Sequence, residues 1–222
     1  MAKSRRSPQR RKEALSRESI IGASIELLDS TGEAGLTFSA LSEHLATGAG
    51  AIYWHIANRN DLLVAACDAI IARTMGEHVV RATPRETIRE LATRMFDAMD
   101  AHPWVGAVLV RVAGQLPMVR IFERIGQQVR ALGVPGDKQW VAVSAILNYI
   151  LGVGGQNAAN AQFASVQGLD RAKFLDEVST AWSQLAPDQY PFARSVAGHM
   201  RTHDDRVDFI AGIDLILNGI RS

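Results

Sequence analysis

The segment 35–63 constrains the fold of this chain more than any other, because it predicts two short helices joined by a tight turn. The hydroxyl of Thr37 can cap the first helix by accepting a hydrogen bond from a free backbone N–H group. Gly48 makes the turn easy, and Ile52 and Ile56 stand four residues apart, as on the buried face of a second helix. Two helices that cross at such a turn can place the second one in the major groove of DNA, so the sequence predicts a helix-turn-helix unit.

Helix signals of the same kind recur along the rest of the chain. Ser16 can cap a helix ahead of this unit, Asp137 can cap a long apolar helix, and residues 83–86 form a capping box with proline at the first helical position. No segment alternates apolar and polar residues convincingly, so the chain is predicted to be all-α, without a sheet. Three glycines are expected to loosen or kink the long apolar helix: Gly152, Gly154 and Gly155.

Charge is distributed unevenly along the 222 residues, although the formal net charge is only +1. Residues 1–17 carry seven Lys or Arg and one acid, whereas the remainder carries 17 Lys or Arg against 22 Asp or Glu. A basic head on a mildly acidic body suits a protein that contacts phosphates with one end only. A solvated tail without a partner is the alternative interpretation of the same segment.

About 60 residues around the helix-turn-helix resemble the DNA-binding domain of the tetracycline repressor (TetR) family. The matching residues are Gly35-Leu36-Thr37, Leu41, Leu45, Ile52-Tyr53-Trp54-His55-Ile56, Asn58, Arg59 and Leu62-Leu63. A weaker match, at residues 209–219, resembles the last helix of the subgroup nearest the tetracycline repressor itself. The resemblance implies a basic arm at 1–15, an N-terminal three-helix helix-turn-helix DNA-binding domain at 16–62, and a larger C-terminal helical ligand-binding and dimerisation domain at 63–222.

The resemblance also implies which residues contact DNA. Thr37, Tyr53, His55 and Arg59 match family positions that contact the DNA backbone, and Trp54 beside them is expected partly to support the helix. Base reading falls to the start of the second helix, where this chain has small residues in place of larger polar ones: Gly48, Ala49, Gly50 and Ala51. Because these side chains have no donor and reach little beyond a thymine methyl group, specificity would depend on groove shape and on the arm. The arm's expected phosphate contacts are Arg5, Arg6, Arg10, Arg11 and Lys12.

A homodimer on a palindromic double-stranded DNA operator is implied as well, because two recognition helices must meet successive major grooves about 34–36 Å apart. The long apolar helix that begins near Trp140 and the final helix are candidates for a four-helix interface between subunits. In the final helix the expected interface residues are Phe209, Ile213, Ile216 and Leu217. The alternative is that both helices only fill the core of a single subunit.

The family further implies a small-molecule ligand that releases the protein from its operator, which favours repression. A ligand pocket is expected to combine aromatic walls with a few polar groups. Candidates from the predicted C-terminal helices are Phe96, Met99, Trp104, Arg111, Gln115, Phe122, Asn148, Gln156, Asn157 and Trp182. The metal-binding histidine of the tetracycline site aligns with no histidine of this chain, so no metal and no cofactor are expected.

Enzymatic activity is not expected. His199 and His203 stand four residues apart beside two aspartates, but no third histidine follows at a metal-ligand spacing. The single cysteine, Cys67, is expected to be a buried small residue in a reducing compartment. The apolar run 140–153 is too short to cross a bilayer, so a cytoplasmic location without membrane contact is expected. A helical small-molecule-binding protein or scaffold without operator-specific DNA binding is the alternative function.

Overall fold

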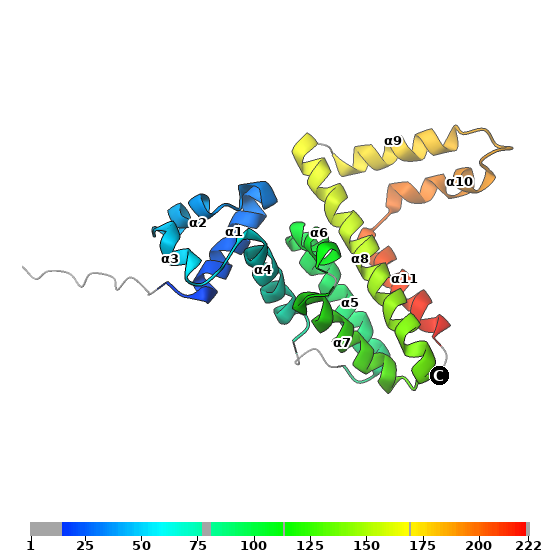
Figure 1. The fold of residues 1–222 in the computed structure, drawn as a ribbon. Coiled ribbons are helices and arrows are strands. Elements are labelled where there is room, and N and C mark those ends of the chain that lie inside the picture. Colours follow the sequence, from blue (N-terminus) through cyan, green and yellow to red (C-terminus); the bar gives the residue numbers. More distant parts are fainter. Residues whose placement is uncertain (1–14, 77–80, 113, 169, 221–222) are drawn as a thin grey trace, which may run out of the picture. The chain divides into compact units, whose positions relative to one another are not determined.

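The computed structural model describes residues 15–76, 81–112, 114–168 and 170–220, and these residues form helices but no strand (Figure 1). The α-helices are α1 Arg17–Gly35, α2 Phe38–His44, α3 Ala49–Tyr53, α4 Arg59–Thr74, α5 Pro84–Ala101, α6 Trp104–Arg111, α7 Leu116–Ala131, α8 Gly136–Gln167, α9 Arg171–Ser183, α10 Pro191–Val196 and α11 Asp205–Gly219. A short 3-10 helix, η1, covers Ala197–Thr202. The all-α prediction is therefore confirmed.

The chain divides into two compact units, of which the first ends at Ala66 and the second begins at Cys67. Because α4 runs from Arg59 to Thr74, the helix begins in the first unit and ends in the second. A single continuous helix thus links the two units through its backbone.

Helix capping sets the boundaries within the first unit. Ser16 forms a capping box with Ser19 at the start of α1, and the Thr37 hydroxyl accepts a hydrogen bond from the backbone N–H of Ala40, at 3.0 Å, at the start of α2. Gly32 has φ of +67°, which interrupts α1 near its end and favours glycine at this position. The helices then pack around one small core, whose fully buried members include Ile20, Leu28, Leu41 and Ile52.

The second unit is built around α8, a helix of 32 residues that packs against α5, α6, α7 and α11. Its inward side repeats every three or four residues, as a buried helix face requires. The buried apolar side chains on this face are Val143, Ile146, Leu147, Ile150 and Ala158. No single helix among the described residues is long and apolar enough to span a membrane, and only the pair α6 and α7, bent by 92°, passes that test together.

The glycines of α8 do not end it, because the helix runs without interruption from Gly136 to Gln167. A Cβ atom on Gly154 would overlap the buried end of the Met99 side chain in α5. A Cβ atom on Gly106 of α6 would lie 3.3 Å from the Cα atom of Gly155. These glycines therefore allow neighbouring helices to approach α8 closely, which is a packing role that spacing alone did not indicate.

The buried residues of α11 correct the predicted subunit interface. Phe209, Ile213 and Leu217 are almost fully buried within the subunit, because α11 packs on α5 and α8. The ring of Phe209 stacks on Tyr149 of α8 with ring centroids 5.5 Å apart. These side chains are already covered within one subunit, so another side of α11 must serve any contact with a partner.

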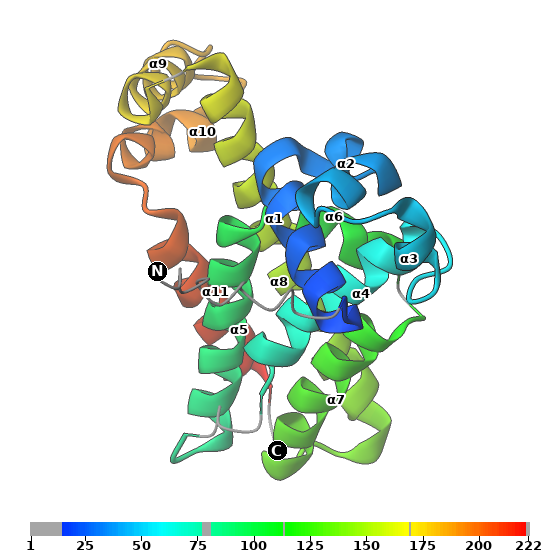
Figure 2. The same cartoon turned by 90° about the vertical axis from the view of Figure 1, so that its left-hand side faces the viewer.

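Beyond α8 the chain makes an excursion before it returns as α11 (Figure 2). Helices α9, α10 and η1 form a hairpin whose main helix-to-helix contacts are with one another rather than with the rest of the second unit. Figure 1 shows α9 and α10 running side by side beyond the end of α8, while α11 lies along α8 itself. We call the segment 171–202 the hairpin.

We expect Gly212→Ala to destabilise the second unit. A Cβ atom at this position would overlap the Tyr149 ring and disturb the hydrogen bond, 3.2 Å long, that its hydroxyl donates to the Phe209 carbonyl oxygen. Overpacking of this kind costs about 1–3 kcal/mol, of which about 1 kcal/mol returns as helix propensity. Thermal unfolding followed by circular dichroism measures the difference.

Gly126→Ala in α7 is the matched control for that substitution. Its Cβ atom would meet a methyl group of Val143 at 3.9 Å, which is an ordinary contact. This variant should gain up to about 1 kcal/mol from helix propensity alone. If both variants unfold at the same raised temperature, the Tyr149 contact does not constrain α11.

Candidate nucleic-acid interface and ligand cavity

The candidate recognition helix α3 is short and has small side chains on its accessible side. It begins after Gly48, which provides no side-chain cap, and it is anchored by the fully buried Ile52. Of the predicted base-reading residues, Gly48 and Gly50 are exposed, whereas Ala49 and Ala51 are half-buried. A duplex could approach the backbone of this helix closely, because no long side chain stands in front of it.

Aromatic stacking joins α3 to α2. The rings of Tyr53 and Phe38 lie parallel within 10°, with centroids 4.2 Å apart. Such a pair contributes about 0.5–1.5 kcal/mol beyond its buried area. Tyr53 nevertheless remains 53% exposed, so its hydroxyl stays available to an external acceptor. Phe38, which stands where the family commonly has a polar residue, thus helps to hold α3 against α2.

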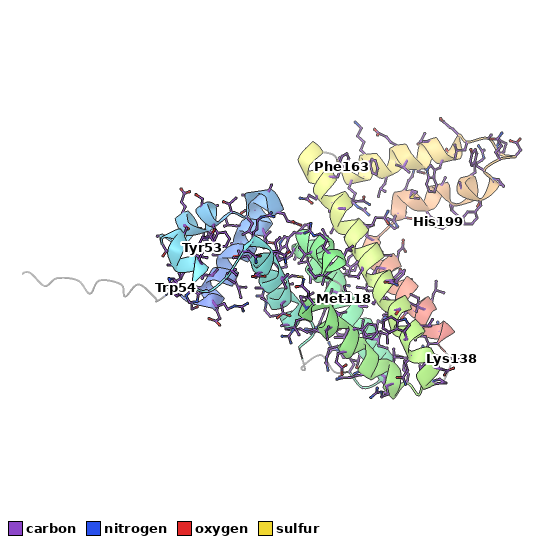
Figure 3. The ribbon with its side chains drawn as sticks, viewed as in Figure 1. Tyr53, Trp54, Met118, Lys138, Phe163 and His199 are labelled. Atoms are coloured by element: carbon purple, nitrogen blue, oxygen red, sulfur yellow. The ribbon has the colours of Figure 1, made fainter. Side chains whose placement is uncertain are left out.

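Trp54 differs from its expected role as a partial support of the helix. The side chain is 89% exposed and takes part in no ring contact among the described residues. Figure 3 shows it beside Tyr53 at the end of α3. An indole with this exposure carries a free N–H donor, which suits a contact outside the protein better than a packing role.

Arg59 is held by its own unit. Its Nε atom donates to the carbonyl oxygen of Leu36 at 2.9 Å, and Nη2 donates to the carbonyl oxygen of Glu33. Both oxygens lie at the C-terminal end of α1, where helix carbonyl groups lack intrahelical partners and a cation is favourable. Arg59 therefore ties the start of α4 to the end of α1, whether or not it also contacts a phosphate.

The other predicted backbone contacts lie on exposed positions of the same unit. Thr37 is exposed at the start of α2, and His55 is exposed in the turn after α3. The side chain of Asn58 caps the following helix through the backbone N–H of Asp61 at 2.9 Å. The predicted arm contacts, Arg5, Arg6, Arg10, Arg11 and Lys12, lie outside the described residues.

A cavity of about 650 Å³ lies between the hairpin and the helices α5, α8 and α11 of the second unit. This size is typical of sites for drug-sized molecules. Its apolar walls come from four elements, α5, α8, α9 and η1, and Figure 3 shows Phe163 near the end of α8. The larger apolar side chains are Phe96, Phe163, Phe174, Leu175, Val178 and Met200.

Charged side chains line the same cavity and form ion pairs across it. Arg206 of α11 contacts both carboxylate oxygens of Asp97 in α5, at 2.8 and 3.1 Å. Arg171 of α9 contacts Asp205 at 2.5 Å. Asp100 of α5 accepts a hydrogen bond from the Asn157 amide of α8 at 3.2 Å. Sequence reasoning proposed Asn157 but missed the charged residues as pocket candidates, because they meet only where helices far apart in the sequence pack together.

Few of the predicted pocket residues line this cavity. Phe96 and Asn157 do, while Gln156 and Asn157 line a second hollow of about 240 Å³ beside it. The others lie elsewhere: Met99 and Trp104 are buried in the core, Phe122 packs on Trp140, Arg111, Gln115 and Asn148 are exposed, and Trp182 lies half-buried on α9. The prediction placed the pocket within the helix bundle, whereas the larger cavity lies at its edge.

The remaining reactive groups are two histidines of the C-terminal part and the single cysteine. Nδ1 of His203 lies 2.6 Å from Asp208 and Nε2 lies 2.7 Å from Asp205, whereas His199 is exposed. No group of three or more metal-ligating side chains lies together in the part of the chain that the structure describes. Burial raises the pKa of the Cys67 thiol to about 12, so this cysteine stays protonated near neutral pH and is a poor nucleophile.

The fold and the exposed recognition helix define a helix-turn-helix regulator with a separate helical unit that contains a cavity. Residues 81–222 match the family model of the tetracyclin repressor-like C-terminal domain. The structure of SCO7222, a TetR transcriptional regulator from Streptomyces coelicolor, is similar with 50% identity and a TM-score of 0.85, over 93% of this chain and 98% of that one. The chain belongs to the tetracycline repressor family of transcriptional regulators, which confirms the resemblance.

Two curated relatives match shorter parts of the chain. An HTH-type transcriptional regulator from Saccharopolyspora erythraea is 27% identical over 145 residues, which are 64% of this chain and 61% of that protein. The class D tetracycline repressor protein from Escherichia coli is 44% identical over 59 residues, which are 27% of each chain. The chain thus aligns with less than two thirds of the length of either relative.

Proposed function

We propose that the protein is a transcriptional repressor that binds a palindromic DNA operator as a homodimer and leaves it when a small molecule binds the second unit. The observation that carries this proposal is an accessible α3, held in place by Ile52 and by the Phe38–Tyr53 stack, in a chain of this family. A protein with this function acts on DNA in the cytoplasm. It needs no catalytic activity.

The proposed DNA contacts divide into two groups. Thr37, Tyr53, Trp54 and His55 are exposed around α3 and would fix the position of the protein on phosphates. The segment 48–51 would face the base edges. Because it presents only glycine and alanine, it can contact thymine methyl groups and sense groove width, but it cannot donate side-chain hydrogen bonds. The arm would add nonspecific affinity from its closely spaced cations.

Helix α4 is the proposed connection between ligand and DNA. Its first half belongs to the first unit, where Arg59 ties it to α1. Its second half is bound within the second unit by Asp68, which accepts hydrogen bonds from Arg120 of α7 at 2.7 and 3.4 Å. A shift of α7 or of its neighbours would therefore move α4. Release from the operator needs a ligand that prefers one position of α4 by several kcal/mol, about 3–5.

The outward sides of α8 and α11 are the proposed dimer surface. From Gln139 to its end α8 contains no charged residue, yet it exposes Val141, at 67%. On α11 the outward side carries Val207 and Leu215, which are 62% and 74% exposed. Exposed apolar and uncharged surface on two neighbouring helices is typical of an interface between subunits. This proposal keeps the two helices that the sequence predicted for the subunit interface, but it assigns the contacts to their outward residues.

Binding to duplex DNA should weaken steeply with salt. We expect a log–log slope steeper than about −4 for a dimer on a labelled random-sequence duplex, measured by fluorescence anisotropy between about 50 and 200 mM salt. Deletion of residues 1–12 should flatten this slope by at least about 2, because six cations are lost from each chain. A variant with those six residues changed to glutamine keeps the length of the chain and should show the same reduced slope as the deletion. An unchanged slope would show that the arm does not contact phosphates.

The residues of α3 should separate affinity from specificity. Ala49→Gln introduces a side chain that can pair with adenine, so selection from a random DNA pool should return a different preferred operator. Tyr53→Ala removes both the hydroxyl and the stack on Phe38 and should weaken all operators by about tenfold. Tyr53→Phe keeps the stack, so its affinity for operators should lie between those of the wild type and Tyr53→Ala. Identical operator motifs for wild type and Ala49→Gln would place base reading elsewhere.

A charge on the outward side of α11 should separate the subunits. Leu215→Arg would bury a guanidinium group in the interface and should raise the dimer dissociation constant by at least about tenfold. Sedimentation equilibrium measures this constant directly. Val119→Arg is the control, because Val119 of α7 is also exposed, at 52%, but lies outside the proposed surface. The proposed interface would be contradicted if the two substitutions raised the dimer dissociation constant equally, or if neither raised it.

A further inference from the structure

The cavity beside the hairpin carries an excess of negative charge. Its lining includes four carboxylates, Asp97, Asp100, Asp204 and Asp205, against two guanidinium groups. Both guanidinium groups are used, because Arg206 pairs with Asp97 and Arg171 pairs with Asp205. The additional carboxylate of Asp208, near the second hollow, is balanced at most by His203 between it and Asp205. Two carboxylates therefore remain without an ion-pair partner among the described residues.

The two uncompensated carboxylates are not equivalent. Asp204 caps α11, where its oxygen accepts the backbone N–H of Val207 at 2.9 Å and the positive end of the helix dipole favours its charge. Asp100 lies in the last turn of α5, where the helix dipole is negative and no basic residue is present. Its hydrogen-bond partner is the neutral side-chain amide of Asn157. Asp100 is exposed and has no ion-pair partner among the described residues, so its carboxylate is accessible to a cation from outside.

The apolar part of the cavity suits a flat aromatic body. Phe163 of α8 and Phe174 of α9 line it with side chains that are 61% and 49% exposed, whereas Phe96 of α5 lines it but is almost fully buried against Phe209. Aromatic faces attract cations as well as apolar rings. The hairpin, which supplies Phe174, has few contacts with the helices α5, α8 and α11. A molecule in the cavity would therefore add contacts to the hairpin and to these helices.

We propose that this cavity binds an amphipathic organic cation, with an aromatic body between the phenylalanine rings and a protonated amine or quaternary nitrogen at Asp100. The proposal deepens the proposed function, because it names the chemical class of the releasing ligand. The bound molecule would contact both Phe163 of α8 and Phe174 of α9 and would thereby hold the hairpin closer to α8. Anions of the same shape would be rejected by the uncompensated carboxylates.

The test compares two acridines that share one ring system, with DNA absent. 9-Aminoacridine is a cation at neutral pH and acridine-9-carboxylate is an anion, and titration calorimetry on the full chain measures both affinities. We expect the cation to bind at least about tenfold more tightly than the anion. Asp100→Asn should weaken the cation about five- to tenfold and leave the anion unchanged or slightly tighter.

Two further variants give the matched controls. Asp188→Asn removes an exposed carboxylate that does not line the cavity and should change neither affinity. Phe174→Ala should weaken both compounds, because it removes shared ring contact. The melting temperature of Asp100→Asn should be unchanged or slightly higher, because a charge at an unfavourable helix end is lost; this measurement separates loss of binding from loss of folding.

Equal affinity for both acridines, no effect of Asp100→Asn on the cation, or no binding of the cation at about 1 mM would each overturn the proposal. So would loss of dimer in Phe174→Ala without loss of acridine affinity, because a second copy would then occupy the gap. DNA binding is measured separately, without acridine. If DNA binds and the cation does not, the ligand class is wrong; if the cation binds and DNA does not, the regulatory function is wrong.

Discussion

The close packing of α8 against its neighbours is the constraint on which the second unit depends. Where Gly154 meets Met99 of α5, and Gly155 meets Gly106 of α6, the helices approach within a distance that a side chain would prevent. Because packed interiors tolerate little overlap, these contacts fix the position of α8 at this point of its length. The outward side of the same helix is thereby presented to solvent or a partner, and its far end is left to form a wall of the cavity.

Local signals in the sequence predicted the helices well, because capping and periodicity act within one or two turns. The caps at Ser16, Thr37 and Thr83 lie where the sequence indicated them, whereas Asp137 lies within the first turn of α8 rather than at its cap. In contrast, the packing role of the glycines of α8 was not predicted, since glycine lowers helix propensity by about 1 kcal/mol but also permits close packing. Which effect wins depends on the neighbouring helix, and a single sequence does not say which helix that is.

The candidate sites show the same division between local and tertiary information. The exposed positions around α3 follow from one short motif, and the structure leaves them accessible as a DNA contact requires. The cavity depends on α11 returning to α5 across more than one hundred residues of chain, as in the pair Arg206–Asp97. Aromatic and polar residues were therefore recognised as candidates, but their grouping was not, and Met99 and Trp104 are core residues. A carboxylate in the last helical turn without a nearby base, as at Asp100, was a usable signal that went unnoticed.

Because the residues of α3 are small, other parts of the protein must contribute to the choice of operator. A recognition helix with Gly48, Ala49, Gly50 and Ala51 contributes little direct discrimination between bases, since each good bidentate contact that it lacks is worth about 1–3 kcal/mol. Discrimination must then arise from methyl contacts, groove shape and the spacing of two half-sites. Spacing is a property of the dimer and of α4, so in this protein operator choice and ligand response rest on the same geometry. A change that alters the position of α4 should therefore alter which operators are bound as well as how tightly.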